Sequence, residues 1–406
     1  MAAHALTRDP WDTSFESALN PHLAAAREVA TQLRGTAAER ERADQQPFAE
    51  IDLLRRANLL EVLEPQEFGG GGLKWHQALR IVREVAAGDT SIGQLLGYHY
   101  SISRFPLIAG RRGQYEQVGR RSATEQWFWG DAVDPLGPEI ILTRDGDGFR
   151  ANGYKDFSTG ASVADRVLIY VSLDGNPGAA VIPRKRDGVR FDRSSWNHLG
   201  QRLTESCRTI LDNVRIEADE IIGEIPAPAN SVPATLGIPL IQSVFSAFYL
   251  GAARGALIDA ANYVRGTTRP WLHSGTDQAS EDPYIIERFG EFEVELRAAE
   301  ALLERAGEQL QGALDRGVGL TAQERGEAAV TAYAAKVQST RVALDITSRV
   351  FEVQGARSTA RRYDFDRRWR DVRTHTLHDP VVYKTREVGD FILNGRVPEP
   401  DGGRYR

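Results

Sequence analysis

The sequence predicts an α+β fold in which a strand-rich segment separates two helical ones. Apolar residues recur at helical spacing up to about residue 124. Short apolar runs bounded by Gly, Asp and Pro then extend over about 110 residues, and the helical period returns afterwards. We therefore expect an N-terminal helical domain (1–124), a middle β-domain (125–235) and a C-terminal helical domain (236–406).

The N-terminal segment carries several amphipathic patterns typical of helices. Three such helices are predicted over residues 15–35, 48–60 and 74–87. Asp89 is a good N-cap for a further, largely apolar helix over 91–108. Tyr98, His99 and Tyr100 place three polar aromatic groups inside that apolar helix, either as satisfied core residues or as the wall of a pocket.

The middle and C-terminal segments differ in period. Strands are predicted at residues 140–142, 167–171, 179–182, 209–211 and 214–216. Long helices are predicted at residues 241–264, 284–316 and 323–351. No GxGxxG motif follows a predicted strand, so a dinucleotide bound in the Rossmann manner is not expected.

Composition narrows the class of protein. A net charge of −6 argues against general nucleic-acid binding. The single cysteine, Cys207, excludes an intramolecular disulfide and a multi-cysteine metal site, and we expect no bound metal. The N-terminus lacks the apolar core of a signal peptide, and no run approaches the roughly 20 apolar residues of a membrane span. The sequence thus predicts a soluble cytoplasmic protein with no membrane partner.

The stretch from Trp369 to Pro380 holds two histidines three residues apart. Because proline disfavours helix at the preceding residue, a helix arriving from Phe365 should end near His378 or Asp379. His375 and His378 would share one face of its last turn, where helix carbonyls favour a protonated ring. Either proton chemistry or simple capping of loose carbonyls accounts for such a pair.

Three motifs, in this order and spacing, resemble the acyl-CoA dehydrogenase superfamily. They are the Glu-Pro-Gln-Glu-Phe-Gly-Gly stretch at 64–70, Asn-Gly-Tyr-Lys-Asp-Phe-Ser-Thr-Gly-Ala at 152–161, and Arg-Asp-Val-Arg at 370–373. The resemblance covers nearly the whole chain. It implies the three-domain fold given above with a four-helix bundle as its C-terminal domain, a flavin held between the domains, and usually a homotetramer.

The position of the family's catalytic glutamate separates two branches. Here that position reads Leu-His-Asp-Pro at 377–380, so imidazole stands where a carboxylate is usual. The chain resembles instead the flavin-dependent monooxygenases of this fold, typified by the dibenzothiophene monooxygenases. That likeness extends to residues 96–99, 281–284, 363–367 and 372–375. The alternative is an FAD-dependent acyl-CoA dehydrogenase with Asp379 as its base.

The monooxygenase resemblance implies a two-component reaction. Reduced FMN would come from a separate NAD(P)H:flavin reductase and react with O₂ to give a C4a-hydroperoxyflavin, which oxygenates a small apolar sulfur- or nitrogen-containing compound. The protein must exclude water and supply a general acid at the departing oxygen. His378 is the first candidate for that acid and His375 the second.

The resemblance also assigns roles to other residues. Tyr98 would shape or protonate the pocket, and the hydroxyl of Thr159 would donate to flavin or peroxide. Phe157 and Trp196 would wall the flavin ring, and Ser158 belongs to the same cofactor-binding segment. Because arginine's fork matches a phosphate, candidates for the FMN phosphate are Arg269, Arg288 and Arg357.

Three positions depart from the desulfurisation pattern. Gln94 stands where a histidine is expected, which removes a titratable partner four residues before Tyr98. Glu287 occupies the place of a flavin-side arginine, one residue before Arg288. Asp131 replaces an asparagine and adds a negative charge near the flavin, which suits an amine substrate better than an aromatic thioether.

Overall fold

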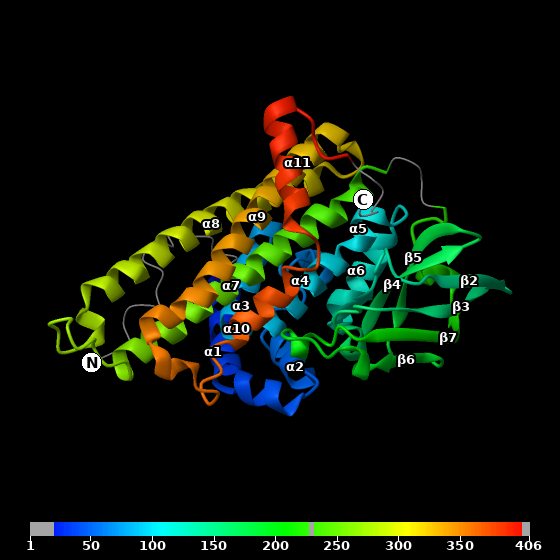
Figure 1. The fold of residues 1–406 in the computed structure, drawn as a ribbon. Coiled ribbons are helices and arrows are strands. Elements are labelled where there is room, and N and C mark those ends of the chain that lie inside the picture. Colours follow the sequence, from blue (N-terminus) through cyan, green and yellow to red (C-terminus); the bar gives the residue numbers. More distant parts are fainter. Residues whose placement is uncertain (1–19, 227–230, 400–406) are drawn as a thin grey trace.

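The computed structural model describes residues 20–226 and 231–399, and its element order is helices, strands, helices (Figure 1). The N-terminal helices are α1 (Asn20–Ala43), α2 (Phe48–Arg56), α3 (Trp75–Gly88), α4 (Thr90–Ser103), α5 (Phe105–Ala109) and α6 (Gln114–Glu125). The first five residues of the helix expected from residue 15 lie outside the described residues. The division at residues 124/125 and 235/236 remains a prediction.

The start of α4 was predicted correctly and its end was not. The Asp89 carboxylate accepts the backbone N–H groups of Ser91 and Ile92, as an N-cap should. The helix expected to continue to residue 108 instead breaks at Arg104, and the short α5 begins beyond it with Pro106 in its first turn. Proline lacks the N–H that an uninterrupted helix needs at this point.

One eight-stranded sheet forms the middle of the described chain. Its strands are β1 (Trp129–Ala132), β2 (Ile140–Asp145), β3 (Gly148–Lys155), β4 (Arg166–Leu173), β5 (Asn176–Pro183), β6 (Val189–Asp192), β7 (Arg208–Ile216) and β8 (Ile221–Ile222). The spatial order is β6-β7-β3-β2-β4-β5-β8, and β1 pairs in parallel with β4. The two strands expected at 209–211 and 214–216 are one strand, β7, which bulges where Asn213 has a positive φ.

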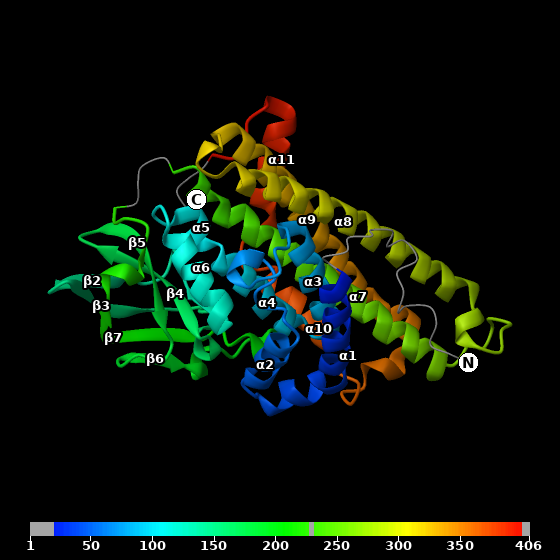
Figure 2. The same cartoon turned by 180° about the vertical axis from the view of Figure 1, so that it is seen from behind.

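The C-terminal helices are α7 (Gly237–Gly266), α8 (Pro283–Arg316), α9 (Ala322–Gln354), α10 (Arg367–His375) and α11 (Val381–Asn394). Sequence patterns anticipated α7, α8 and α9 but not α11. The long helices lie on one side of the molecule and the sheet on the other, with α4 and α10 between them (Figures 1 and 2). This junction of the domains is where the candidate catalytic residues lie.

Helix α7 is the centre of the bundle. By length and mean hydropathy (1.5) the segment Pro233–Gly266 would suffice to cross a membrane, contrary to the expectation that no run approaches that length. Within the structure, 83% of its most apolar window is buried, and it packs against α3, α4 and α9. Burial of this kind is typical of a core helix, which is hydrophobic on all sides.

Helix α10 ends three residues earlier than the sequence predicted. It stops at His375, not at His378 or Asp379. A tight turn follows, in which the His378 N–H donates to the His375 carbonyl at 2.9 Å, and Pro380 then precedes α11. Because Pro380 disfavours helical backbone at the residue before it and α11 packs against α9, the residues before the proline form a turn instead of another helical turn.

Candidate active site

A loop of the β-domain is fixed between α4 and α10. The backbone N–H of Gln201 donates to the Asp371 carboxylate at 2.6 Å, and that of Gly200 donates to the Thr374 hydroxyl at 2.9 Å. The Gln201 side chain donates to Gln94 on α4. Gln94 therefore serves as a buried amide partner that joins two domains. These bonds connect the loop that carries Trp196 to the helix that carries His375.

His375 lies in the core between two tyrosines. Its Nε2 is 3.0 Å from the Tyr98 hydroxyl, and its Nδ1 is 2.7 Å from the Tyr249 hydroxyl. The ring is 4% exposed, and burial lowers its pKa well below the usual range. The expectation that the helix end favours a protonated ring is therefore wrong for His375, because the cost of desolvating the charge exceeds the stabilisation by the helix carbonyls.

His378 lies beside His375, as the three-residue spacing predicted. The two rings are stacked, with centroids 5.3 Å apart and planes 13° apart. The side chain of His378 is 38% exposed, and its Nδ1 is 3.5 Å from the Asp379 carboxylate. His378 thus has the access to solvent that a group exchanging protons needs, whereas His375 has the buried contact with Tyr98.

The carboxylate of Asp379 is already engaged. It lies 3.6 Å from the ammonium of Lys336 and accepts the Gln242 amide at 3.3 Å. Although burial opposes ionisation, the hydrogen bond from His378 and the charge of Lys336 lower the pKa of Asp379. A base with so low a pKa is a poor acceptor for a substrate proton, which weighs against the acyl-CoA dehydrogenase alternative.

Thr159 begins a chain of hydroxyl groups on the β-domain. Its Oγ1 is 2.9 Å from Ser206 Oγ, which is 2.8 Å from Thr204 Oγ1. Thr204 donates its own proton to the Gln201 carbonyl, so Ser206 donates to Thr204 and Thr159 donates to Ser206. In this arrangement Thr159 offers a ligand its lone pairs and not the proton that the sequence led us to expect.

Asp131 on β1 is hydrogen-bonded to the backbone of Thr159. Its Oδ1 accepts the Thr159 N–H at 3.0 Å, and its backbone N–H donates to the Thr159 carbonyl at 3.1 Å. Burial raises the pKa of Asp131 to about 8, and the hydrogen bond from Thr159 offsets this only in part. Asp131 is therefore mainly neutral at pH 7, in contrast to the negative charge that the sequence led us to expect at this position.

Three aromatic side chains gather where the β-domain meets α10. The rings of Phe157 and Trp196 meet edge to face at 6.3 Å, and His198 lies 4.2 Å from Trp196. Phe157 is 59% exposed and has a φ of +52°, which a bulky residue adopts only when its surroundings impose it. The structure thus brings together the two predicted ring-walling residues and adds His198. Ser158 is fully buried and donates to the Lys155 carbonyl.

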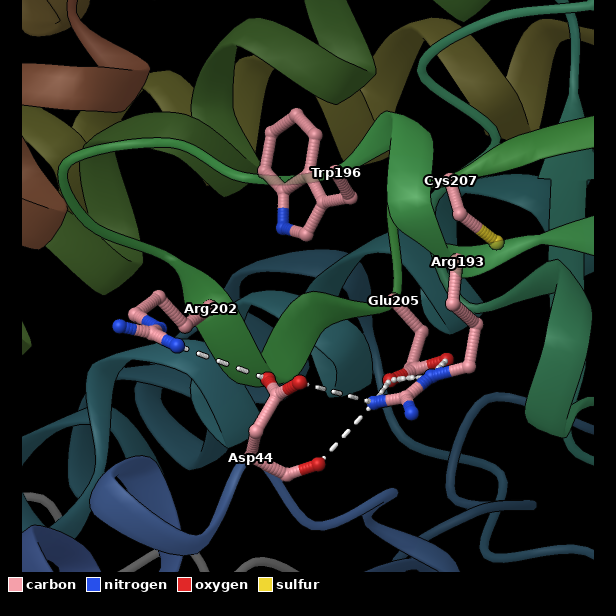
Figure 3. Close-up of a pocket in the computed structure, with 6 residues that line it drawn as sticks. All are labelled: Asp44, Arg193, Trp196, Arg202, Glu205 and Cys207. Carbon is pink, nitrogen blue, oxygen red and sulfur yellow. Dashed lines mark hydrogen bonds and ion pairs between the residues drawn. The ribbon is translucent and has the colours of Figure 1, made fainter.

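Beside Trp196 lies a small polar cavity between the first helices and the β-domain (Figure 3). Its volume is about 10 Å³, enough for about one water molecule. Arg193 closes it with a 2.8 Å ion pair to Glu205 and a second contact of 3.8 Å to Asp44. This space joins two domains and is too small to hold a flavin. Cys207 also lines it, and burial raises the pKa of that thiol to about 12.

The predicted phosphate arginines share the far end of the bundle. Arg288 is 3.3 Å from Glu352 near the end of α9, and Thr268, which precedes Arg269, donates to the Gln354 carbonyl. Arg357 follows shortly after α9. This end lies opposite the sheet in Figures 1 and 2. Within one chain the structure therefore does not bring these arginines to Phe157 and Trp196.

Two aromatic neighbours of Tyr98 are core residues. His99 accepts the Trp129 N–H at 3.1 Å and lies 2.8 Å from the Leu60 carbonyl, and burial lowers its pKa to about 4. Tyr100 donates to the Leu59 carbonyl. Only Tyr98 of the three contacts His375. The Tyr-His-Tyr stretch thus contains both a pocket residue and satisfied core groups.

Sequence reasoning missed Tyr249, Lys336 and His198. Tyr249 and Lys336 are fully buried on α7 and α9, where the helical period marks them only as core positions. A lysine on the apolar face of a predicted helix was the available signal, because lysine is almost never fully buried without a partner. His198 is two residues from Trp196 in a loop that carries no pattern.

Comparison with known proteins identifies the family. Residues 22–120 match the acyl-CoA dehydrogenase N-terminal domain, and residues 243–382 match the acyl-CoA dehydrogenase C-terminal domain. A dibenzothiophene monooxygenase of Mycolicibacterium goodii is 41% identical over 408 residues, covering 97% of this chain and 98% of the relative.

Two solved structures share the fold closely. The methanesulfinate monooxygenase MsuC of Pseudomonas fluorescens superposes with a TM-score of 0.89 at 36% identity, covering 94% of this chain and 99% of that one. The FMN-bound dibenzothiophene monooxygenase TdsC of Paenibacillus sp. A11-2 superposes with a TM-score of 0.88 at 36% identity, covering 94% of this chain and 100% of that one. The chain belongs to the acyl-CoA dehydrogenase superfamily, in its flavin-dependent monooxygenase branch.

Proposed function

We propose that the protein is a two-component monooxygenase that uses reduced FMN and O₂ to oxygenate a small apolar compound containing sulfur or nitrogen. The observation that carries this proposal is the buried contact between Tyr98 and His375, which lies beside the 377–380 segment where a dehydrogenase of this fold would need a free carboxylate. Asp379 is held in an ion pair instead. The kinship with FMN-using monooxygenases supports the same reading.

The residues of the β-domain fit a flat flavin ring. Phe157 presents an exposed aromatic face that its strained backbone holds in place, and Trp196 supports it edge-on. Thr159 offers hydroxyl lone pairs, and the neutral Asp131 carboxyl holds the Thr159 backbone. When bound, reduced FMN supplies the activation of O₂ and the transfer of one oxygen atom.

On the bundle side, the chain's residues manage the proton. Tyr98 and His375 form a buried, hydrogen-bonded donor pair, and His378 stacks on His375 with a solvent-exposed edge. We assign Tyr98 and His375 to proton donation at the reacting oxygen, and His378 to proton exchange with solvent. Packing of Phe245 against both imidazoles keeps water from the buried members of this group.

The substrate class rests on the neutral surroundings of the site. Because Asp131 is mainly protonated at pH 7, it gives an amine no electrostatic preference over a thioether. The named activities of the relatives concern dibenzothiophene and methanesulfinate. We propose a small sulfur compound as the first class to test and a nitrogen compound, such as an amine or a heteroaromatic, as the second.

The proposal includes partners and assembly. A separate NAD(P)H:flavin reductase would supply the reduced FMN in the cytoplasm. The phosphate of FMN is charged, and the candidate arginines lie at the far end of the same chain. We therefore propose a homotetramer in which Arg269, Arg288 or Arg357 of one copy reaches the flavin site of another.

The test is an oxygenation assay with labelled oxygen. The purified protein is mixed with FMN, an NADH:flavin reductase and a panel of thioethers, sulfinates and amines under ¹⁸O₂. Mass spectrometry should find one ¹⁸O atom in a product that forms only when the protein is present. A matched reaction with the reductase alone measures the background from free reduced flavin and hydrogen peroxide.

The same protein preparation distinguishes the proposed monooxygenase from the alternative, an acyl-CoA dehydrogenase. Under anaerobic conditions an acyl-CoA substrate should leave oxidised bound flavin unbleached. Bleaching by an acyl-CoA, together with no ¹⁸O in any product, would establish the dehydrogenase and overturn our proposal.

A further inference from the structure

Behind Tyr98 runs a line of four buried polar groups from four helices, α4, α10, α7 and α9. The Tyr98 hydroxyl meets His375 Nε2 at 3.0 Å, His375 Nδ1 meets the Tyr249 hydroxyl at 2.7 Å, and Tyr249 lies 3.2 Å from Lys336 Nζ. Their exposed fractions are 6% for Tyr98, 4% for His375, and 0% for Tyr249 and Lys336. Since water does not reach the inner members, their polar atoms must find hydrogen-bond partners within the protein.

Lys336 determines which group donates and which accepts in each hydrogen bond of this line. An ammonium group has three donors and no acceptor, so Lys336 donates to the Tyr249 oxygen. Burial raises the pKa of Tyr249 well above its usual range, so this phenol keeps its proton. With its oxygen accepting from Lys336, Tyr249 directs that proton to His375 Nδ1.

The hydrogen bond from Tyr249 in turn determines which ring nitrogen of His375 carries the proton. Because burial holds His375 neutral, only one of its ring nitrogens carries a proton. Nδ1 accepts from Tyr249, so the proton is on Nε2 and is donated to the Tyr98 oxygen. Tyr98 must therefore direct its own proton away from His375.

Asp379 is the counter-ion that keeps Lys336, at the inner end of the line, positively charged. The Asp379 carboxylate lies 3.6 Å from Lys336 Nζ, and the aromatic faces of Phe245 and Tyr249 lie 4.5 and 4.9 Å from it. Burial lowers the pKa of Lys336 to about 8, and Asp379 offsets that effect, so the ammonium form dominates at pH 7. In this arrangement the Asp379 carboxylate balances the charge of Lys336.

We propose that Lys336 is a positioning residue which, through Tyr249, holds His375 as its Nε2–H tautomer and so makes the Tyr98 hydroxyl a proton donor toward the reaction site. The inference rests on the proposed function only for the identity of the acceptor. The opposite reading is a structural ion pair of Lys336 and Asp379 that has no influence on the imidazole.

The first test reads the tautomer directly and needs neither flavin nor turnover. Protein labelled with ¹⁵N-histidine is studied by NMR, and His375 is assigned with a His375→Gln variant. We expect the wild-type ring to carry its proton on Nε2. In Tyr249→Phe, Nδ1 loses its donor, and we expect its signal to move toward the protonated position. A wild-type ring protonated on Nδ1, or a tautomer unchanged in Tyr249→Phe, overturns the proposal.

The second test removes the positive charge of Lys336. Lys336→Met alone leaves the Asp379 carboxylate with one buried partner fewer, so the double variant Lys336→Met/Asp379→Asn is used to keep the fold. Lys384→Met is the matched control, since Lys384 is also buried but pairs with Glu387. We expect the double variant to redistribute the His375 tautomers and the control to leave them unchanged. An unchanged tautomer in the double variant would reduce Lys336 to a structural role.

Product formation distinguishes this inference from the proposed function. If both hold, Tyr249→Phe and the double variant should bind reduced FMN within several-fold of wild type and form about 10- to 100-fold less product, the loss typical of partners that orient a functional imidazole. If the wild-type protein makes no oxygenated product, the proposed function fails, while the tautomer measurement still decides the inference. Normal product formation with a redistributed tautomer contradicts the role assigned to Lys336.

Discussion

The hydroxyl of Tyr98 on α4 lies 3.0 Å from Nε2 of His375 on α10, so residues 277 positions apart in the sequence share one buried hydrogen bond. The bond joins the N-terminal helices to the C-terminal ones at the junction with the sheet. A dehydrogenase of this fold needs a carboxylate base for its substrate. Here the corresponding carboxylate, Asp379, lies 3.6 Å from the ammonium of Lys336. Under the proposed function a phenol and an imidazole would supply the proton instead.

The first prediction concerns the Tyr98 hydroxyl. Tyr98→Phe keeps the ring that stacks on Phe245 but removes the group that bonds His375. We expect FMN affinity within several-fold of wild type and product formation lower by about 10² to 10⁴, the loss typical of a general acid. Product is measured in single-turnover reactions with reduced FMN. Tyr383→Phe, at a 49% exposed position on α11, is the control and should not change product formation. Equal product yield from Tyr98→Phe and wild type would remove Tyr98 from the mechanism.

His378 should affect the outcome of the reaction more than binding. His378→Phe removes a ring that stacks on His375 and contacts Asp379, while preserving an aromatic surface. We expect O₂ consumption to continue and the fraction of oxygen delivered to product to fall by about 10² or more. The measurement is the ratio of product to O₂ consumed, with hydrogen peroxide determined in parallel. His273→Phe, at an exposed histidine in the loop between α7 and α8, serves as the control. A ratio unchanged in His378→Phe contradicts the assignment.

These assignments show which parts of the site follow from sequence. The spacing of His375 and His378 predicted that the rings would meet, because residues three apart share a face both in a helix and in the turn that replaced it. The position of the helix end did not follow, since the turn into α11 depends on packing against α9. The prediction that His375 would be protonated was wrong for a related reason. Burial depends on tertiary structure, and its effect on the pKa of His375 outweighs that of the local helix dipole.

The fold could be predicted from the sequence more completely than the charge states of the buried residues. Asp89 as the cap of α4 and the long amphipathic periods of α8 and α9 depend on local residues, and the structure confirms them. Lys336 stands on the apolar face of a predicted helix, which signals a buried partner, but only the structure shows that this partner is Asp379, 43 positions later. Asp131 likewise read as a charge, because no local pattern reveals that β1 is buried on both faces.

Asp131 should give stability a measurable pH dependence. Its pKa is about 8 in the folded chain and about 3.9 when unfolded, so between these values the folded state binds more protons than the unfolded state. Its contribution to the free energy of unfolding therefore falls as pH rises through that window. Asp131→Asn keeps the shape and removes the titration.

The measurement is urea unfolding of both proteins from pH 5 to 8. The stability of Asp131→Asn relative to wild type should rise with pH, by at most about 1.4 kcal/mol per pH unit. Titrating groups shared by the two proteins, such as Glu61, whose pKa burial raises to about 8, cancel in the difference. Parallel pH profiles would show that Asp131 is ionised in the folded protein and would restore the charge-based argument for an amine substrate.

The last prediction tests whether the Trp196 loop must lie close to α10. A Cβ atom at Gly200 would lie 2.3 Å from the carbonyl of Arg370, which is backbone and cannot turn aside. Gly200→Ala should therefore displace the loop and break the bond from Gly200 N–H to Thr374. We expect a loss of about 1–3 kcal/mol in the free energy of unfolding, as for overpacking. We also expect weaker FMN binding, because the loop that carries Trp196 is held at this contact.

Gly312→Ala on α8 provides the matched control. No atom lies within 4 Å of its added methyl group, so helix propensity alone should raise stability, by up to about 1 kcal/mol, and FMN binding should not change. Urea unfolding and calorimetric FMN titration of both variants separate the two contributions. Because the Gly200 contact joins the β-domain to the helix that ends at His375, intact FMN affinity in Gly200→Ala would mean that Trp196 is not part of the flavin site.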